Sequence, residues 1–263
     1  MRHALAIAKR ELRSYFVSPI AYAAITAFLL LSGYYFNSMV VKYVRDASLY
    51  DGQMERIGRS QFEPFDVPTV ILENFFSNQG SFVFLLVMPL LTMGLLTDER
   101  RKGTLELLLT SPVRPIELAL GKFFGAMALV SIMVAPTLVY FAFLARGGAW
   151  EPGVVAAGFT GLLLLAAAEI AIGLFISSLS ENVLVSALCT YSVLVVLNFI
   201  DASASLTRSI WVDFLQFLSF YFHNLEFARG VIALRDITFY AELLTLALFL
   251  TQRSIESLRF KRS

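Results

Sequence analysis

Long stretches without a single charged residue constrain this chain more than any other feature. Residues 14–41, 74–97, 123–145 and 182–200 contain no Asp, Glu, Lys or Arg, and they are 28, 24, 23 and 19 residues long. A helix needs about 20 mostly apolar residues to cross the hydrocarbon core of a membrane. Helices satisfy their own backbone hydrogen bonds in lipid, and the alternating pattern of barrel strands is absent. The sequence therefore predicts an all-α polytopic membrane protein.

Two further apolar stretches are each interrupted by one acidic residue. Residues 152–180 contain only Glu169, and residues 237–252 contain only Glu242. The composition agrees with a membrane protein, because 16% of the residues are charged, whereas soluble domains have about 25%. We predict six transmembrane helices, at residues 19–41, 78–97, 118–144, 153–179, 183–200 and 236–253.

The distribution of Lys and Arg orients these helices. Six crossings place both termini on one side, and that side holds thirteen of the 21 Lys and Arg residues. Loops rich in Lys and Arg stay in the cytoplasm. We therefore expect a multi-pass protein of the bacterial cytoplasmic membrane, embedded in the lipid bilayer with both termini cytoplasmic. The net charge of +1 supplies no basic field for a nucleic-acid partner.

The remaining segments have distinct expected roles within a single transmembrane domain that covers residues 1–263. Residues 1–16 predict an interfacial helix, with Leu5, Ala8, Leu12 and Phe16 on its apolar face. Residues 42–77 are expected to form an external loop with one short helix near 43–58. Residues 201–235 are aromatic-rich but too charged for a span, which indicates a pair of re-entrant or interfacial helices on the outer side.

Residues 98–115 form the most informative segment. Five consecutive charged residues, 98–102, end at Gly103, and a short leucine-rich stretch follows until Pro112. A helix of about eight residues is too short to cross lipid. One interpretation is an ordinary positively charged cytoplasmic loop. The other is a cytoplasmic coupling region that docks on a motor subunit, with the leucines and Glu106 at the contact.

Catalytic chemistry is not indicated. The phosphate-binding pattern G-x-x-x-x-G-K-[ST] and the common hydrolase and zinc patterns are absent. Two His and one Cys cannot form a metal cage, so neither a catalytic nor a metal site is expected. Glu169 is the one carboxyl well inside a span. It is either a neutral or paired group at a helix interface or a functional intramembrane residue.

The coupling region carries a recognisable motif. Glu99, Gly103, Thr104, Glu106, Leu108, Leu109 and Pro112 form E-x-x-x-G-T-x-E-x-L-L-x-x-P, and Leu120, Gly121 and Lys122 follow. This pattern resembles type-2 ATP-binding-cassette (ABC) permeases. The run FARGVIALRDITFY at 227–240, the SPI at 18–20 and the SSL at 177–179 are similar to the gliding-motility-associated branch. The segment expected to couple to an ATPase comprises Glu99, Arg100, Arg101, Lys102, Gly103, Thr104, Leu105, Glu106, Leu108, Leu109 and Pro112.

The resemblance implies a fold and a set of partners. It implies six transmembrane helices, an N-terminal interfacial helix, a cytoplasmic coupling helix and two outer re-entrant helices before the last span. It also implies two cytosolic ABC ATPases, which bind ATP and Mg²⁺, and a second permease, either the same chain as a homodimer or a paralogue. This chain itself is expected to hold no cofactor. The outer re-entrant segment would include His223, Arg229, Gly230, Arg235 and Asp236.

Three functions follow as alternatives. The first is export of an amphipathic or lipid-linked substrate, driven by ATP hydrolysis in the partner. The second is mechanotransmission, in which ATPase-driven motion acts on an extracytoplasmic partner and nothing is transported. The third is an ion- or proton-coupled secondary transporter that uses Glu169 and requires no ATPase.

Overall fold

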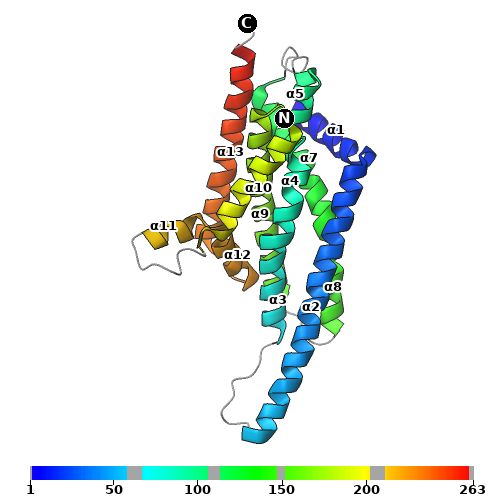
Figure 1. The fold of residues 1–263 in the computed structure, drawn as a ribbon, viewed down its shortest axis with the longest axis vertical. Helices are drawn as coiled ribbons and strands as arrows, with labels where there is room; N and C mark the ends of the chain where they lie inside the picture. The colour runs from blue at the N-terminus through cyan, green and yellow to red at the C-terminus, as the bar shows by residue number, and fades with distance from the viewer. Residues whose placement is uncertain (1, 58–66, 106–112, 147–151, 202–210, 261–263) are drawn as a thin grey trace.

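The regular structure in the described part of the chain is entirely helical. The computed structural model describes residues 2–57, 67–105, 113–146, 152–201 and 211–260. These residues form a bundle of long helices with shorter helices at one end and at one side (Figure 1). The predicted all-α fold is confirmed for these ranges.

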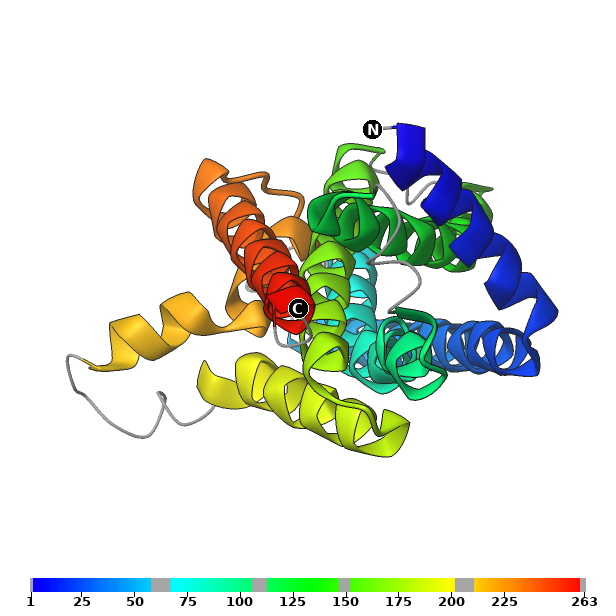
Figure 2. The ribbon, with the colours of Figure 1, turned by 90° about the horizontal axis from the view of Figure 1, so that it is seen from above.

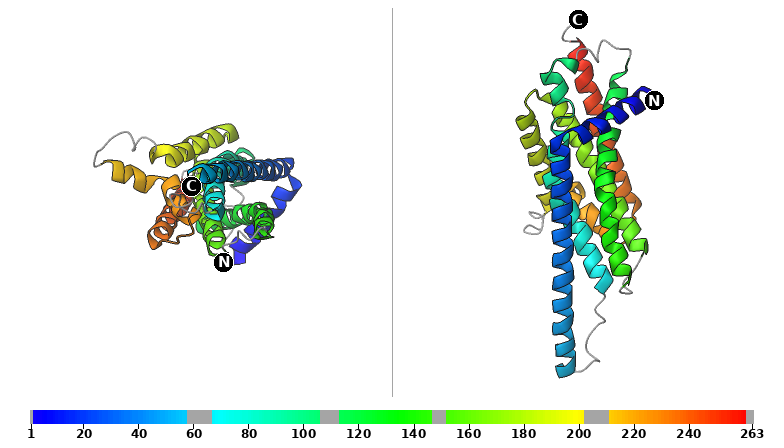
Figure 3. Two further views of the ribbon diagram at one scale, coloured as in Figure 1. Left: turned by 90° about the horizontal axis from the view of Figure 1, so that it is seen from below. Right: turned by 90° about the vertical axis from the view of Figure 1, so that its right-hand side faces the viewer.

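The first two helices are arranged at a sharp angle. Helix α1 (Arg2–Val17) lies across one end of the bundle, and α2 (Pro19–Ile57) runs down its side and extends past the other helices (Figures 1 and 3). Because α2 continues to Ile57, residues 42–57 of the expected external loop are helical. The other described part of that loop belongs to α3 (Val67–Asn78).

Two of the predicted spans are broken near prolines. The second consists of α3, a π-helix η2 (Gln79–Phe84) and α4 (Leu85–Thr92), which contains Pro89, followed by the short α5 (Thr97–Arg101). The third consists of α7 (Pro115–Val134), the 3₁₀ turn η3 (Ala135–Thr137) with Pro136, and α8 (Leu138–Arg146). Proline has no N–H and clashes with the carbonyl four residues before it, so regular α-helix is interrupted there.

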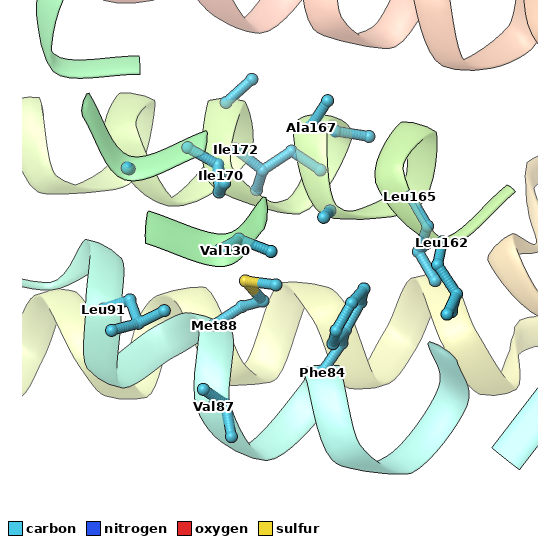
Figure 4. Close-up of a cluster of buried hydrophobic side chains, with 14 of the residues drawn as sticks. Phe84, Val87, Met88, Leu91, Val130, Leu162, Leu165, Ala167, Ile170 and Ile172 are labelled. Atoms are coloured by element: carbon cyan, nitrogen blue, oxygen red, sulfur yellow. The ribbon is translucent and has the colours of Figure 1, made fainter. Parts of the chain in front are cut away.

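Helix α9 (Pro152–Leu179) occupies the centre of the bundle. Figure 2 shows it enclosed by the other helices, among them α13 (Leu234–Phe260) and α10 (Val183–Phe199). Its small residues Ala166–Ala168 and Gly173 are buried, as expected for helix packing. The surrounding core is apolar, and Figure 4 shows Phe84 of η2 and Met88 of α4 facing α9 and Val130 of α7.

The number of spans is confirmed only in part. Four helical segments are long and apolar enough to cross a membrane, at Ala21–Arg45, Ile71–Arg101, Pro115–Ala145 and Pro152–Leu179. Helix α10 is apolar but has 17 residues. Helix α13 has 27 residues and carries charges near both ends. Crossing by α10 and α13 therefore stays a prediction.

Two short helices lie between α10 and α13. They are α11 (Trp211–Leu218) and α12 (Phe220–Ala228), with eight and nine residues, and they lie to one side of the bundle near the start of α13 (Figure 1). A helix of that length spans roughly 13 Å and cannot cross a bilayer. Residues 211–228 thus have the paired short helices that the sequence predicts.

Candidate functional site

The end of the bundle that carries α1, α5 and the turn at residues 180–182 is called here the charged end. Helix α1 packs closely along α7 there because two glycines leave room for it. A Cβ on Gly121 would lie 2.6 Å from the Ile7 Cβ atom, and one on Gly125 would lie 2.7 Å from the Glu11 Cβ atom. The G-x-x-x-G spacing at 121–125 thus does form a helix contact, and its partner is α1.

The face of α1 that packs differs from the predicted one. Ala4 and Ile7 are buried against the bundle, whereas Leu5 is 73% and Phe16 39% exposed. The prediction of Leu5 and Phe16 on a single apolar face therefore does not describe the packed side. The reason is the pair of glycines on α7, which accepts the α1 backbone near Ile7 and leaves Leu5 on the opposite, outer side.

A buried lysine joins three elements at the charged end. Lys122, on α7, is 2% exposed, and its Nζ atom lies 3.2 Å from Glu11 Oε2 on α1 and 3.1 Å from Glu99 Oε1 on α5. Arg10 of α1 also donates to Glu99 Oε1, at 2.9 Å. Glu99 therefore receives two cations from two helices, and the four residues Arg10, Glu11, Glu99 and Lys122 form what we call the charge node.

A second set of contacts ties α5 to the turn between α9 and α10. Arg100 donates to the carbonyl of Ser178 at 2.5 Å and pairs with Glu181 at 3.1 Å. Thr97 donates to the carbonyl of Ser177 at 2.9 Å. Ser254 of α13 donates to the same Ser178 carbonyl at 3.3 Å. Helix α5 is thereby connected to α9, and one backbone carbonyl of α9 is shared with α13.

Helix α1 has one further polar contact with the second span. Tyr15 Oη donates to the carbonyl of Leu91 at 3.0 Å. Burial, with a smaller contribution from the Glu11 carboxylate, raises the pKa of the Tyr15 hydroxyl well above its usual value, so it remains a neutral donor. Next to this contact is a cavity of about 350 Å³, bordered by Glu11, Asp98 and Arg101 among others.

The predicted coupling residues do not all share one environment. Arg101, Lys102, Gly103 and Thr104 are exposed, while Arg100 is held against the turn described above. Gly103 has φ +68°, a backbone conformation that favours glycine and ends α5. Leu105 is 4% exposed and belongs to the core, so it is not part of an exposed docking surface in this structure. Glu106, Leu108, Leu109 and Pro112 lie outside the described residues.

At the start of α13, Asp236 forms a buried pair with His223 of α12. The His223 Nδ1 atom lies 2.6 Å from Asp236 Oδ1, the His223 Nε2 atom lies 2.9 Å from the carbonyl of Phe217, and neither side chain is exposed. The Arg235 Nε atom also approaches Asp236 Oδ1, at 3.3 Å. His223 thus hydrogen-bonds both to the start of α13 and to the end of α11.

The remaining residues of this segment fix how α12 ends. Arg229 pairs with Glu73 of α3 at 3.1 Å, and Gly230 has φ +86°. A Cβ at Gly230 would lie 2.8 Å from a Val154 methyl group, so both the backbone conformation and the space require glycine. Within the described residues, no group of three or more His, Cys, Asp or Glu side chains could hold a metal ion.

Sequence reasoning missed most of the charge node. The sequence places Lys122 in the permease motif and Ser177 and Ser178 in the SSL motif, but it does not predict that Lys122 is buried between Glu11 and Glu99. The available signal was the position of Lys122, directly after the Gly121 of a packing motif and at the start of an apolar stretch. A charged residue there must be paired if a second helix covers it.

These features define the class of protein. Apolar helices long enough to cross a membrane end beside a group of short segments that is held together by ion pairs and hydrogen bonds. The model of the ABC-2 family transporter proteins matches residues 5–229, so the chain belongs to this family. Its members are the membrane subunits of ABC transporters, work with an ABC ATPase and are typically non-catalytic. No curated protein matches the chain.

Proposed function

We propose that this chain is the permease subunit of an ABC exporter. A separate cytosolic ATPase, present in two copies, binds ATP and Mg²⁺, and the permease converts its motion into export of an amphipathic or lipid-linked substrate. The working unit contains two permeases, as a homodimer or with a paralogue, in the bacterial cytoplasmic membrane. Within the family we propose the gliding-motility-associated branch, which the FARGVIALRD run resembles.

The charge node is the observation that carries the proposal. The coupling region begins with α5, and Glu99 on α5 is bonded to Arg10 of α1 and to Lys122 of α7. Arg100, the next residue, is bonded to the α9–α10 turn. A displacement of α5 must therefore move these elements or break charge-assisted hydrogen bonds, which are among the stronger contacts in proteins. Packed elements of this kind shift between discrete arrangements.

The orientation follows from the same end of the molecule. Arg10, Arg100, Arg101, Lys102 and Lys122 all lie at the charged end. Basic segments next to membrane helices stay on the cytoplasmic side. The N-terminal α1 and the last turns of α13 lie toward this end as well (Figures 1 and 3). Both termini are then cytoplasmic, and α11 and α12 face the outer half of the membrane.

The test compares three variants in a reconstituted permease–ATPase complex. Glu99→Gln removes the charge that binds Arg10 and Lys122. A hydrogen bond to a charged group contributes about 1.5–3 kcal/mol of interaction free energy, which this variant loses. We expect permease-stimulated ATP hydrolysis to fall about tenfold while the ATPase still co-purifies. Glu106→Lys is expected to abolish co-purification.

Asp98→Asn is the matched control, because Asp98 is the adjacent carboxyl and has only a 3.7 Å pair with the exposed Arg101. ATP hydrolysis should change less than twofold in this variant. If Glu99→Gln and Glu106→Lys both behave like Asp98→Asn, the coupling role of this segment is refuted.

Mechanotransmission is the second candidate, favoured by one observation. Helix α2 extends beyond the rest of the bundle at the end opposite the charged end (Figure 3), where it could contact an extracytoplasmic partner. The two functions differ in whether a substrate crosses the membrane. Vesicles with the complete complex should accumulate labelled lipid-linked cargo in an ATP-dependent way if the chain exports, and ATP hydrolysis without any flux would favour mechanotransmission.

A further inference from the structure

The central helix contains a carboxyl group that nothing around it satisfies. Glu169 of α9 is 0% exposed, and neither of its carboxyl oxygens has a hydrogen-bond partner. Moving an ionised carboxylate into an apolar interior without a counter-charge is strongly unfavourable, and such groups take up a proton instead. The charge state of Glu169 is therefore decided by its few polar neighbours.

The nearest polar neighbours belong to α10. Its buried residues are Ser186, Thr190, Leu194 and Asn198, which share one face at intervals of four. The amide of Asn198 approaches the Glu169 carboxyl. Its Nδ2 atom donates to the Leu194 carbonyl at 3.0 Å, but its Oδ1 atom has no hydrogen-bond partner.

The hydroxyl groups of α10 are unusual for this protein. Thr92 and Thr251, also buried, donate to the carbonyl four residues earlier, at 2.9 and 2.7 Å. The hydroxyls of Ser186 and Thr190 are buried without any hydrogen-bond partner. The buried face of α10 therefore has polar atoms without a hydrogen-bond partner at Ser186, Thr190 and Asn198.

No cation among the described residues faces Glu169. From α13, the titratable neighbour is Tyr240, whose hydroxyl interacts with Glu169 and Asp236. Asp236 is itself paired with His223 of α12 and Arg235. Helix α4 has no titratable residue, and Cys189 and Tyr191 of α10 are exposed.

Helices α7, α3 and α5 do not supply a cation either. The charged residues of α7 lie near its start, where Lys122 is occupied by two carboxylates. The charged residue of α3 is Glu73, which is itself an acid and is paired with Arg229. Arg100 of α5 is bonded at the α9–α10 turn.

We propose that Glu169 and Asn198 form a proton-binding site between α9 and α10. While Glu169 is ionised, its oxygens can accept from the Asn198 Nδ2 atom but cannot bond to Asn198 Oδ1, because both are then acceptors. One proton on Glu169 creates an O–H donor that can bond to Asn198 Oδ1 and satisfies both orphaned groups at once. Release of this proton to water requires water at the carboxylate, and therefore separation of α9 from α10. Proton binding and closure of this interface are linked.

The direct test is infrared spectroscopy of the purified full chain at pH 7. The wild type is expected to show the C=O stretching band of a protonated carboxylic acid, and Glu169→Gln to lack it. Glu242→Gln is the matched control, since Glu242 is the exposed carboxyl of α13, and it should retain the band. An identical spectrum for wild type and Glu169→Gln in this region would show that Glu169 is ionised and would overturn the proposal.

A second variant protects the test against a folding failure of Glu169→Gln. Asn198→Leu removes the acceptor but keeps the carboxyl, so the band should persist and move to higher frequency because its hydrogen bond is lost. A band whose frequency does not change in Asn198→Leu would refute the Glu169–Asn198 pairing.

The linkage to closure is tested by hydrogen exchange across α10. After correction for intrinsic exchange, protection of the α10 amides should fall about tenfold for each pH unit over which opening releases one proton. In Glu169→Gln the corrected protection should not depend on pH. Equal pH dependence in both proteins would contradict the linkage. These measurements use the permease alone, so they are independent of its proposed ATPase.

Discussion

Replacement of Lys122 by Met tests the charge node most sharply. The variant keeps the length of the side chain but leaves Glu11 and Glu99 facing each other without the cation that lies 3.2 and 3.1 Å from them. Breaking a buried ion pair by removal of one partner costs about 3–5 kcal/mol. Glu11 and Glu99 are 14% and 15% exposed, and Arg10 remains bound to Glu99. We therefore expect the free energy of unfolding to fall by about 3 kcal/mol, the lower end of that range. This changes the unfolding equilibrium constant roughly a hundredfold.

The assay is reversible unfolding of the purified chain in mixed micelles, followed by circular dichroism. Arg101→Met is the control, because Arg101 is 62% exposed and its pair with Asp98 is 3.7 Å long. The Arg101→Met variant should lose at most about 0.5 kcal/mol of unfolding free energy.

A second comparison removes the carboxylates together with the lysine. The combination of Lys122→Met with Glu11→Gln and Glu99→Gln leaves no uncompensated buried charge, so most of the lost stability should return. If Lys122→Met and Arg101→Met lose the same stability, or if the triple variant recovers no stability, the assignment of the charge node is refuted.

Three further predictions use the same unfolding measurement. Gly121→Ala places a Cβ 2.6 Å from Ile7 and should cost about 1–3 kcal/mol, whereas Gly153→Ala meets no atom within 4 Å and should be neutral or slightly stabilising; equal effects would contradict the close α1–α7 packing. Gly230→Ala should cost more than Gly103→Ala, since both have positive φ but only Gly230 also lacks space. His223→Leu should cost about 1–3 kcal/mol, because it removes the 2.6 Å hydrogen bond to the buried Asp236 and leaves that carboxyl with Arg235 alone, and an unchanged midpoint would show that this hydrogen bond does not stabilise the fold.

The predicted spans agree with the structure where the hydrophobic pattern alone decides. The charge gaps at 14–41, 74–97 and 123–145 and the stretch 152–180, which only Glu169 interrupts, correspond to the four segments long enough to cross a membrane. A long uncharged stretch has one stable conformation in lipid, so local composition is sufficient there. Helix ends are less determined by composition, and the short helix expected near 43–58 is a continuation of α2.

The packing of α1 could not be derived from periodicity. Leu5 and Ile7 are similar in hydrophobicity, and only the surface of α7 decides that Ile7 is buried and Leu5 exposed. The same holds for Leu105, which looked like part of a docking surface and lies in the core. Which apolar residue is buried depends on a partner helix that is remote in sequence.

The sequence by itself determined that this is a helical membrane protein, where most of its long helices lie, and that its charges concentrate near residue 100. These properties depend on the transfer of side chains between water and lipid, which is additive along the chain. The tertiary structure alone decided which charges meet. Glu99 bonds to residues 89 positions before it and 23 after it, and Glu169 is enclosed without a cation. Electrostatic pairing and desolvation depend on distances in space, and only the packed helices set those distances.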